Sequence, residues 1–561
     1  MDTEVCHFSK AQYQIGEEIC IDIPTRVLHP QLSLFHLAEE IPVTIKLEPG
    51  KIILSNVPEG NYGVCIGEGD FWWEGAFDVV SAASHITRYG FLSDFSADDM
   101  DVKDVEWMRD LHINAVQFYD WMFRHDLLLS PEEEYADPMG RPTALNTIRK
   151  KLALCRKLGI RPFAYGAVYA AGEETFQSHP EWAMYTMDHQ PMKFADWLYF
   201  MNVSEECGWT DHLMEQYRNA LQFGFEGIHM DTYGFPKAVW DSEGKAVDLS
   251  NEFPKLINRM ARMAQKENEG NGVIFNAVNN WPTETVATSE QDSVYIEVWP
   301  PHNTYFDLYT LIREVKLKSN RPVTLAAYMK PFQEADQQAA MTALRLCWAA
   351  ICASGGTQLV FGEGQAVLRD SYYANYGKLQ PNMLPVAQKY CDFLVRYADL
   401  LYDNVGMDVS KTAAGGINED ICFFGQDCEF SVDAKPNTVW SIIKESASRL
   451  SIQLINLRGN DDFWNEPKNP PRQAESIRIR MRFDRPLRGI YCASPDKKSL
   501  AAIKLSYTCE DTPTGRYYDV DLPVLEYWCA VWAEVEDEQC ADRIQCRLTS
   551  KGENDRPHTV Q

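Results

Sequence analysis

Between residues 85 and 405, short apolar runs alternate eight times with longer stretches of helical periodicity. This alternation is typical of βα units, in which helices cover a parallel sheet. Eight such units over roughly 310 residues predict a (β/α)8 barrel with some long loops. The expected strands are residues 89–94, 115–120, 161–168, 227–231, 273–279, 294–299, 323–328 and 358–362.

Two of the intervening stretches show the helical pattern clearly. Apolar residues between 145 and 158 recur at spacings of three and four, and Gly159 ends the stripe. Residues 339–353 are apolar on nearly every face, which indicates a helix buried against the barrel.

The sequence on both sides of the barrel region has β character. Residues 1–84 contain short alternating runs separated by Gly, Pro and Asn turns, and similar runs return after residue 405. Both patterns indicate β-sandwiches. The expected fold class is therefore multidomain α/β: a TIM barrel at 85–405, an N-terminal sandwich at 1–84 and a C-terminal sandwich at 406–561.

The charge balance argues against some partners. The chain has 53 Lys and Arg against 81 Asp and Glu, a net charge of −28, which disfavours nucleic acid and anionic membranes. No apolar stretch approaches the roughly 20 residues of a membrane span. The first residues show no secretory signal, so we expect a cytoplasmic location, or secretion if the sequence lacks its native N-terminus.

Motifs for cofactors and metals are missing from the sequence. There is no GxGxxG after the first strand, no GxxxxGK[ST], no GxSxG and no paired-His motif. The cysteines and histidines do not cluster at zinc-ligand spacing. We therefore expect neither a cofactor nor a metal.

Two carboxylates end strand-like runs, Asp231 after GIHM and Glu297 within VYIEVW. Barrel enzymes work at the carboxyl ends of their strands. Alternation places Asp231 on the same face as His229, and Glu297 on the same face as Tyr295 and Trp299. An aromatic wall raises a carboxyl pKa, which suits Glu297 as proton donor, whereas a better-solvated Asp231 stays ionised as a nucleophile.

Each of these residues also has a structural interpretation. Asp231 or Glu297 can be a helix N-cap or a salt-bridge partner, and His229 is better explained as a packed layer of the barrel than as a catalyst.

Other strand ends are polar and rich in aromatic residues, although about half of those aromatics fit a core. Together they predict binding of a hydroxylated ligand such as a sugar. The candidate binding residues are Asp94, Asp120, Trp121, His125, Tyr165, Asn279, Trp299, Tyr328 and Glu363.

Several motifs resemble those of glycoside hydrolase family 66, over about residues 10 to 530. They are RYGFLSDF (88–95), VQFYDWMFRH (116–125), GFEGIHMD (224–231), YIEVW (295–299), GE (362–363), YYANY (372–376) and LEYW (525–528). QFYDWM-x-RH is the most specific of them. The resemblance implies an immunoglobulin-like domain, a (β/α)8 barrel and a C-terminal β-domain.

The resemblance also implies an activity. Family members are endo-dextranases or cycloisomaltooligosaccharide glucanotransferases, which act on α-1,6-glucan with retention. Asp231 corresponds to the nucleophile and Glu297 to the acid/base, and Asp120, Trp121 and His125 to sugar contacts by a looser match. The cyclising members carry a carbohydrate-binding module inserted in the barrel region, and the connections here are too short for one.

The expected function is thus retaining endo-hydrolysis of α-1,6-linkages in dextran or isomaltooligosaccharides. The alternatives are a cycloisomaltooligosaccharide-forming transferase and a non-catalytic glucan-binding protein.

Overall fold

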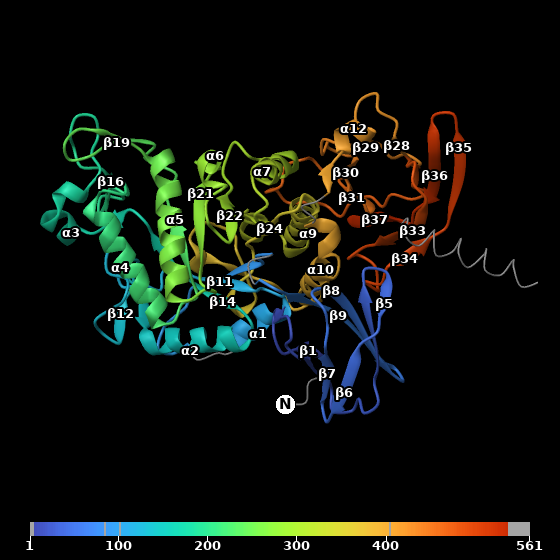
Figure 1. The fold of residues 1–561 in the computed structure, drawn as a ribbon, viewed down its shortest axis with the longest axis horizontal. Coiled ribbons are helices and arrows are strands. Elements are labelled where there is room, and N and C mark those ends of the chain that lie inside the picture. Colours follow the sequence, from blue (N-terminus) through green and yellow to red (C-terminus); the bar gives the residue numbers. More distant parts are fainter. Residues whose placement is uncertain (1–4, 83–85, 100–102, 403–405, 537–561) are drawn as a thin grey trace, which may run out of the picture. The chain divides into compact units, whose positions relative to one another are not determined.

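The computed structural model describes residues 5–82, 86–99, 103–402 and 406–536, and Figure 1 shows its fold. The chain divides into two compact units, Met1–Tyr402 with Phe463–Pro470, and Asp403–Asp462 with Pro471–Gln561. The predicted domain boundaries at 84/85 and 405/406 fall at segments outside the described residues, so these boundaries stay predictions.

An eight-stranded parallel sheet forms the centre of the first unit. A parallel bridge between Phe91 and Gly362 brings its last strand segment to its first, so the sheet is a nearly closed barrel. The predicted barrel is confirmed, although several strands end earlier than expected because the polar residues at their carboxyl ends belong to loops. The strands, in order of pairing, are β10 (Tyr89–Leu92), β11 (Ala115–Phe118), β14 (Arg161–Ala167), β18 (Gly227–Asp231), β21 (Gly272–Val278), β22 (Ser293–Glu297), β23 (Val323–Ala326) and β24 (Thr357–Gln358).

Helices follow the barrel strands along the chain (Figure 1). The apolar stripe predicted for residues 145–158 is buried on α2, and Gly159 follows it with φ +70°, a conformation that glycine adopts without strain. Helix α9 buries residues on nearly every face, as predicted. The main helices are α1 (Lys103–Asp110), α2 (Leu145–Lys157), α4 (Gly208–Phe223), α5 (Leu249–Glu267), α7 (Tyr305–Lys318), α9 (Gln337–Ala353) and α10 (Leu384–Arg396).

The N-terminal residues form two sheets that share one apolar core, as predicted for a sandwich. Ile19 and Leu54 from one sheet and Val64 and Phe77 from the other belong to this core. The first sheet pairs β1 (His7–Phe8), β3 (Ile19–Asp22), β7 (Lys51–Ser55) and β6 (Thr44–Glu48). The second pairs β2 (Tyr13–Gln14), β9 (Phe71–Val80), β8 (Gly60–Glu68), β4 (Gln31–His36) and β5 (Glu39–Ile41).

A small lobe is inserted in the loops that follow β14 and β18. It contains α3 (Glu173–Ser178), the three-stranded sheet of β15 (Ala170–Ala171), β17 (Leu198–Phe200) and β16 (Lys193–Phe194), and the hairpin of β19 (Ala238–Trp240) and β20 (Ala246–Asp248). A bridge between Tyr185 and Trp240 joins the two insertions. We call residues 170–200 and 238–248 the mouth lobe, because they follow the carboxyl ends of barrel strands.

The second unit is built from two sheets around one apolar core that includes Ile443, Ile452, Ile479 and Val531. The larger sheet pairs β27 (Met407–Asp408), β30 (Val439–Glu445), β31 (Arg449–Asn456), β37 (Trp528–Val535), β33 (Leu487–Ala493) and β34 (Ile503–Leu505), with β29 (Phe430–Ser431) also on β30. The smaller pairs β28 (Ile421–Phe424), β32 (Arg478–Arg482), β36 (Gly515–Asp521) and β35 (Tyr507–Thr512). Among the described residues of the whole chain, no helix has the length and apolar character to cross a membrane.

Candidate active site

The barrel brings the two predicted carboxylates together. Asp231 is the last residue of β18 and Glu297 the last of β22, with β21 paired between these strands. Asn276 on β21 donates from Nδ2 to Asp231 Oδ1 at 2.7 Å and to Glu297 Oε2 at 3.1 Å. Because both oxygens share one donor atom, they lie less than about 6 Å apart, close enough to act on one sugar ring.

Each carboxylate also accepts a tyrosine hydroxyl. Tyr165 on β14 donates to Asp231 Oδ2 at 2.8 Å, and Tyr328, just after β23, donates to Glu297 Oε1 at 2.7 Å. Within the part of the chain that the structure describes, neither carboxylate forms an ion pair, and neither caps a helix. The salt-bridge and N-cap interpretations therefore do not apply to this arrangement.

The environment raises the pKa of both carboxyl groups. Burial raises the pKa of Glu297 as predicted, but it also raises the pKa of Asp231, and the negative charge of Glu297 adds to that effect. Asp231 is half-buried whereas Glu297 is buried, so Asp231 is the more exposed carboxylate, as predicted, but this exposure does not keep its pKa low. Two carboxyls this close oppose each other's ionisation, so the pair holds a single proton over part of the pH range.

His229 is a packed residue of the barrel interior, as interpreted from the sequence. Its ring stacks between those of Tyr89 and Tyr165 and meets the edge of Tyr295. Its Nδ1 lies 3.1 Å from the Tyr89 hydroxyl. Burial lowers the His229 pKa to about 3, so the imidazole is neutral at physiological pH.

A cavity of about 640 Å³ opens above the two carboxylates. Its rim carries apolar side chains that remain in contact with solvent, Trp299 at 38% and Phe235 at 50% exposure. Such rings offer flat faces to sugar rings. Of the residues predicted from the sequence, those that line this cavity are Asp231, Glu297, Tyr165, Asn279, Trp299 and Tyr328.

Three predicted binding residues of the loop after β11 lie outside the cavity lining. Trp121 is 0% exposed, packs against Phe225 and donates from its indole to the Tyr165 carbonyl oxygen. It therefore contacts the strand that carries Tyr165 and does not face the cavity. Asp120 is buried, lies 3.8 Å from the Arg141 guanidinium and has a pKa that burial raises to about 7. His125 is buried as well, and burial lowers its pKa to about 4.

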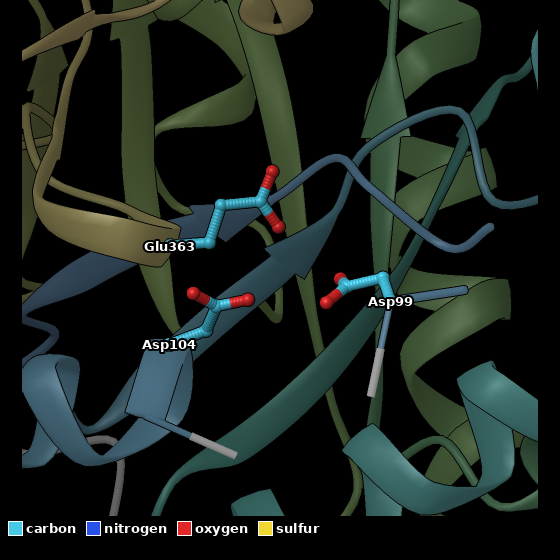
Figure 2. A group of neighbouring side chains, drawn as sticks. All are labelled: Asp99, Asp104 and Glu363. Carbon is cyan, nitrogen blue, oxygen red and sulfur yellow. The ribbon is translucent and has the colours of Figure 1, made fainter. Parts of the chain in front are cut away.

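Asp94 and Glu363 also lie outside the cavity lining, and they meet each other. Asp94 is exposed, and its backbone N–H donates to the buried carboxylate of Glu363. Figure 2 shows Glu363 beside Asp99 and Asp104, with carboxylate oxygens of the three within 4.8 Å of one another. Lys151 Nζ lies 3.5 Å from Asp104 and 3.6 Å from Glu363, and it also bonds to Asp99. Because this ammonium group already neutralises part of the cluster, the arrangement forms an ion network in which Lys151 and Glu363 are buried and Asp99 and Asp104 are half-buried.

The sequence motifs and the geometry point to the same family. The family model described as glycosyl hydrolase family 66 matches residues 72–532. The chain belongs to glycosyl hydrolase family 66. The resemblance stated from the motifs is thereby confirmed.

Relatives of this family 66 chain carry two names. The chain is 25% identical over 612 aligned residues to a cycloisomaltooligosaccharide glucanotransferase of Niallia circulans, covering 82% of this chain and 63% of the relative. It is 20% identical over 531 residues to a dextranase of Streptococcus salivarius, covering 79% of this chain and 62% of the relative. The chain thus spans less than two thirds of the length of these curated relatives.

A solved structure supports the fold. A Paenibacillus sp. cycloisomaltooligosaccharide glucanotransferase, crystallised with cycloisomaltoheptaose, matches with a TM-score of 0.86 at 21% identity, over 95% of this chain and 99% of that chain. At this level of identity the likeness shows the architecture that this family 66 chain shares with the neighbour.

Sequence reasoning did not select several residues that line the cavity of the family 66 chain. Asn276 is one of the polar residues near the carboxyl end of β21 and lines the cavity, but it was not among the candidate binding residues. Phe194 comes from the mouth lobe and lines the cavity. Its ring stacks on that of Tyr233, with the two ring centroids 4.3 Å apart. No local pattern indicates such a contact, because the lobe folds back from a distant loop.

Proposed function

We propose that this chain hydrolyses α-1,6-glucosidic linkages in dextran or isomaltooligosaccharides with retention of configuration. The observation that carries the proposal is the amide of Asn276, which binds oxygens of both Asp231 and Glu297. Retaining glycosidases hold their two carboxyl groups roughly 5–5.5 Å apart, whereas inverting enzymes need roughly 6.5–9.5 Å to admit water. A shared donor favours the shorter separation.

In the proposed reaction, Glu297 protonates the glycosidic oxygen while Asp231 attacks the anomeric carbon. The C–O bond to the leaving sugar breaks, and a β-glucosyl ester forms on Asp231. Glu297, now ionised, then removes a proton from a water molecule that attacks the same carbon and releases Asp231. A pair of carboxyls that holds one proton supplies both starting states, one acid and one nucleophile.

Hydrolysis is favoured over cyclisation by the shorter length of this chain within its match to a cyclising relative. The alignment with the Niallia glucanotransferase extends over 612 positions, more than the 561 residues of this chain. That relative therefore contains residues inside the matched region that this chain lacks. Such extra residues agree with the expectation that this chain lacks the inserted binding module, although the name of this relative and that of the solved neighbour keep cyclisation as the second candidate.

The test is incubation with dextran followed by sizing and chromatography of the products. The wild type should yield linear isomaltooligosaccharides, and Asp231→Ala and Glu297→Gln should each lose activity by at least about 100-fold. Azide should restore turnover of Asp231→Ala and give a product of inverted configuration. Glu226→Gln, just before the amino end of β18, is the matched control and should stay active.

The other outcomes separate the candidates. Cyclic products as the major species would favour the transferase. Binding of isomaltooligosaccharides without turnover would favour a non-catalytic glucan-binding protein. Near wild-type activity of either carboxylate variant would overturn the assignment of the two roles.

A further inference from the structure

The side chain of Asn276 occupies the centre of the candidate active site. Its exposed fraction is 4%, it lies two residues before the carboxyl end of β21, and it lines the cavity. Its Nδ2 atom is the donor common to Asp231 and Glu297. Among the described residues, no other side chain donates a hydrogen bond to both carboxylates.

The chemistry of these contacts determines how the amide is oriented. The ionised carboxylate of Asp231 only accepts hydrogen bonds, so the NH₂ group of Asn276 faces the pair, where it bonds to both Asp231 and Glu297, and its carbonyl oxygen points elsewhere. That oxygen, Oδ1, is buried and has no hydrogen-bond partner in the described structure. A buried acceptor without a partner is unfavourable, so it is a place where a ligand donor would be stabilised.

A second amide repeats this arrangement three residues later. Asn279 donates from Nδ2 to the carbonyl oxygen of Pro300 at 3.0 Å, which fixes its orientation in the same way. Its Oδ1 is also without a partner and Asn279 lines the same cavity. Gln117 on β11 adds a third unpartnered amide oxygen, Oε1, among the lining residues. A cavity with several free acceptors suits a ligand rich in O–H donors.

We propose that Asn276 is a positioning residue that sets the spacing of the Asp231 and Glu297 carboxylates and accepts a hydroxyl group of the sugar bound between them. The inference rests on the proposed function, because it assigns Asn276 to the same reaction. Its NH₂ group acts on the two reacting carboxylates, and its carbonyl oxygen acts on the substrate. The two roles use different atoms of one amide and can be separated by substitution.

Loss of the NH₂ group has a predictable effect on ionisation. Hydrogen bonds from Asn276 lower the pKa of both carboxyls, against the raising effect of burial. Without them both pKa values rise, so both limbs of the pH profile move to higher pH. Other titratable groups around the pair stay in place in such a variant. They include Asp120, His229, Lys237, Tyr119, Tyr165, Tyr169, Tyr217, Tyr233, Tyr295, Tyr328, Tyr372 and Tyr373.

The experiment compares kcat and KM for dextran across pH in the full chain. Asn276→Ala removes both roles, so kcat should fall about 100-fold, KM should rise, and both limbs should shift upward by about one pH unit. Asn276→Asp keeps the shape and the acceptor oxygen but replaces the NH₂ group. It should lose kcat and shift both limbs while its KM stays near that of the wild type.

Asn271→Ala is the matched control, because Asn271 is buried just before the opposite end of β21 and bonds to the Ala264 carbonyl oxygen. It should leave both limbs unchanged, whatever its effect on the melting temperature. If Asn276→Ala behaves in the same way, with only lower stability, the role is structural and this inference is overturned while the proposed function stands. A wild type that neither binds nor cleaves dextran overturns both.

Discussion

At the scale of single residues, the two carboxylates of the site differ in the tyrosine that serves each of them. Tyr165 donates to Asp231 and Tyr328 donates to Glu297, with similar distances of 2.8 and 2.7 Å. Both hydrogen bonds lower the pKa of the carboxyl that accepts them. Substitution of each tyrosine should therefore change the pKa of one carboxyl group, that of the nucleophile or that of the acid/base.

Removing each hydroxyl should move a different limb of the activity profile. In Tyr165→Phe the pKa of Asp231 rises, so the acidic limb, which reports ionisation of the nucleophile, should move up by about one pH unit. In Tyr328→Phe the pKa of Glu297 rises, so the alkaline limb, which reports loss of the acid's proton, should move up instead. The measurement is kcat/KM on dextran from acid to alkaline pH.

Tyr217→Phe is the control for this pair of variants. Tyr217 is fully buried on α4 and its hydroxyl bonds to the Gly166 carbonyl oxygen, outside the cavity lining. It should leave both limbs in place. Movement of the alkaline limb alone in Tyr165→Phe, together with movement of the acidic limb alone in Tyr328→Phe, would contradict the assigned roles of the two carboxylates.

At this scale, the direction of a side chain could be predicted from the sequence only where the backbone is a regular strand. Alternation along β18 and β22 placed Asp231 and Glu297 in the barrel interior, because both residues still belong to strands. Trp121 was predicted to bind substrate, but Asp120 before it has φ +51°. That conformation interrupts the alternation, and Trp121 packs into the protein. Local sequence patterns do not contain such a reversal.

At the scale of elements, the ion network around Lys151 joins segments that are far apart in the sequence, and Figure 2 shows its three carboxylates. Lys151 on α2 contacts Asp104 on α1, Asp99 in the preceding loop and Glu363 after β24. It also donates to the Asp94 carbonyl oxygen at 2.8 Å. The network thus ties the loop after β10 to the segment that closes the barrel.

Loss of the Lys151 charge should be costly. Lys151→Met leaves the buried carboxylate of Glu363 and the half-buried Asp99 and Asp104 without their cation, and breaking a buried pair from one side costs about 3–5 kcal/mol. We expect a clear drop in the unfolding free energy, measured by denaturant titration, and partial recovery when Glu363→Gln is added. Lys150→Met, at an exposed position of the same helix, should change stability little. Equal effects at the two positions would contradict the network.

The strands of the barrel could be predicted because each is a short apolar run, whereas the ion network could not. Lys151 lies within the amphipathic stretch of α2, and sequence alone gives no sign that its ammonium group is buried. Burial of a lysine needs partners from other elements. Those partners come from three separate segments, which only the closed barrel brings together.

At the scale of the whole molecule, buried polar contacts join the N-terminal sandwich to the barrel. Arg88, just before β10, binds Asp78 of β9 through two guanidinium nitrogens at 2.9 and 3.0 Å. Asp392 of α10 accepts from the backbone of Ala76 and pairs with His112 at 2.8 Å. These contacts explain why the sandwich and the barrel form one compact unit, although their sequence patterns predict two domains.

The net charge of −28 gives a prediction about the substrate for the same molecule. A neutral glucan gains nothing from long-range electrostatic attraction, so kcat/KM on dextran should change less than about twofold between roughly 10 and 300 mM salt. The polyanion dextran sulfate should be repelled and should not inhibit at low salt. Initial rates with and without dextran sulfate across this salt range test both statements. Strong inhibition that salt relieves would instead reveal a cationic surface near the cavity, and the substrate class would then have to include acidic polymers.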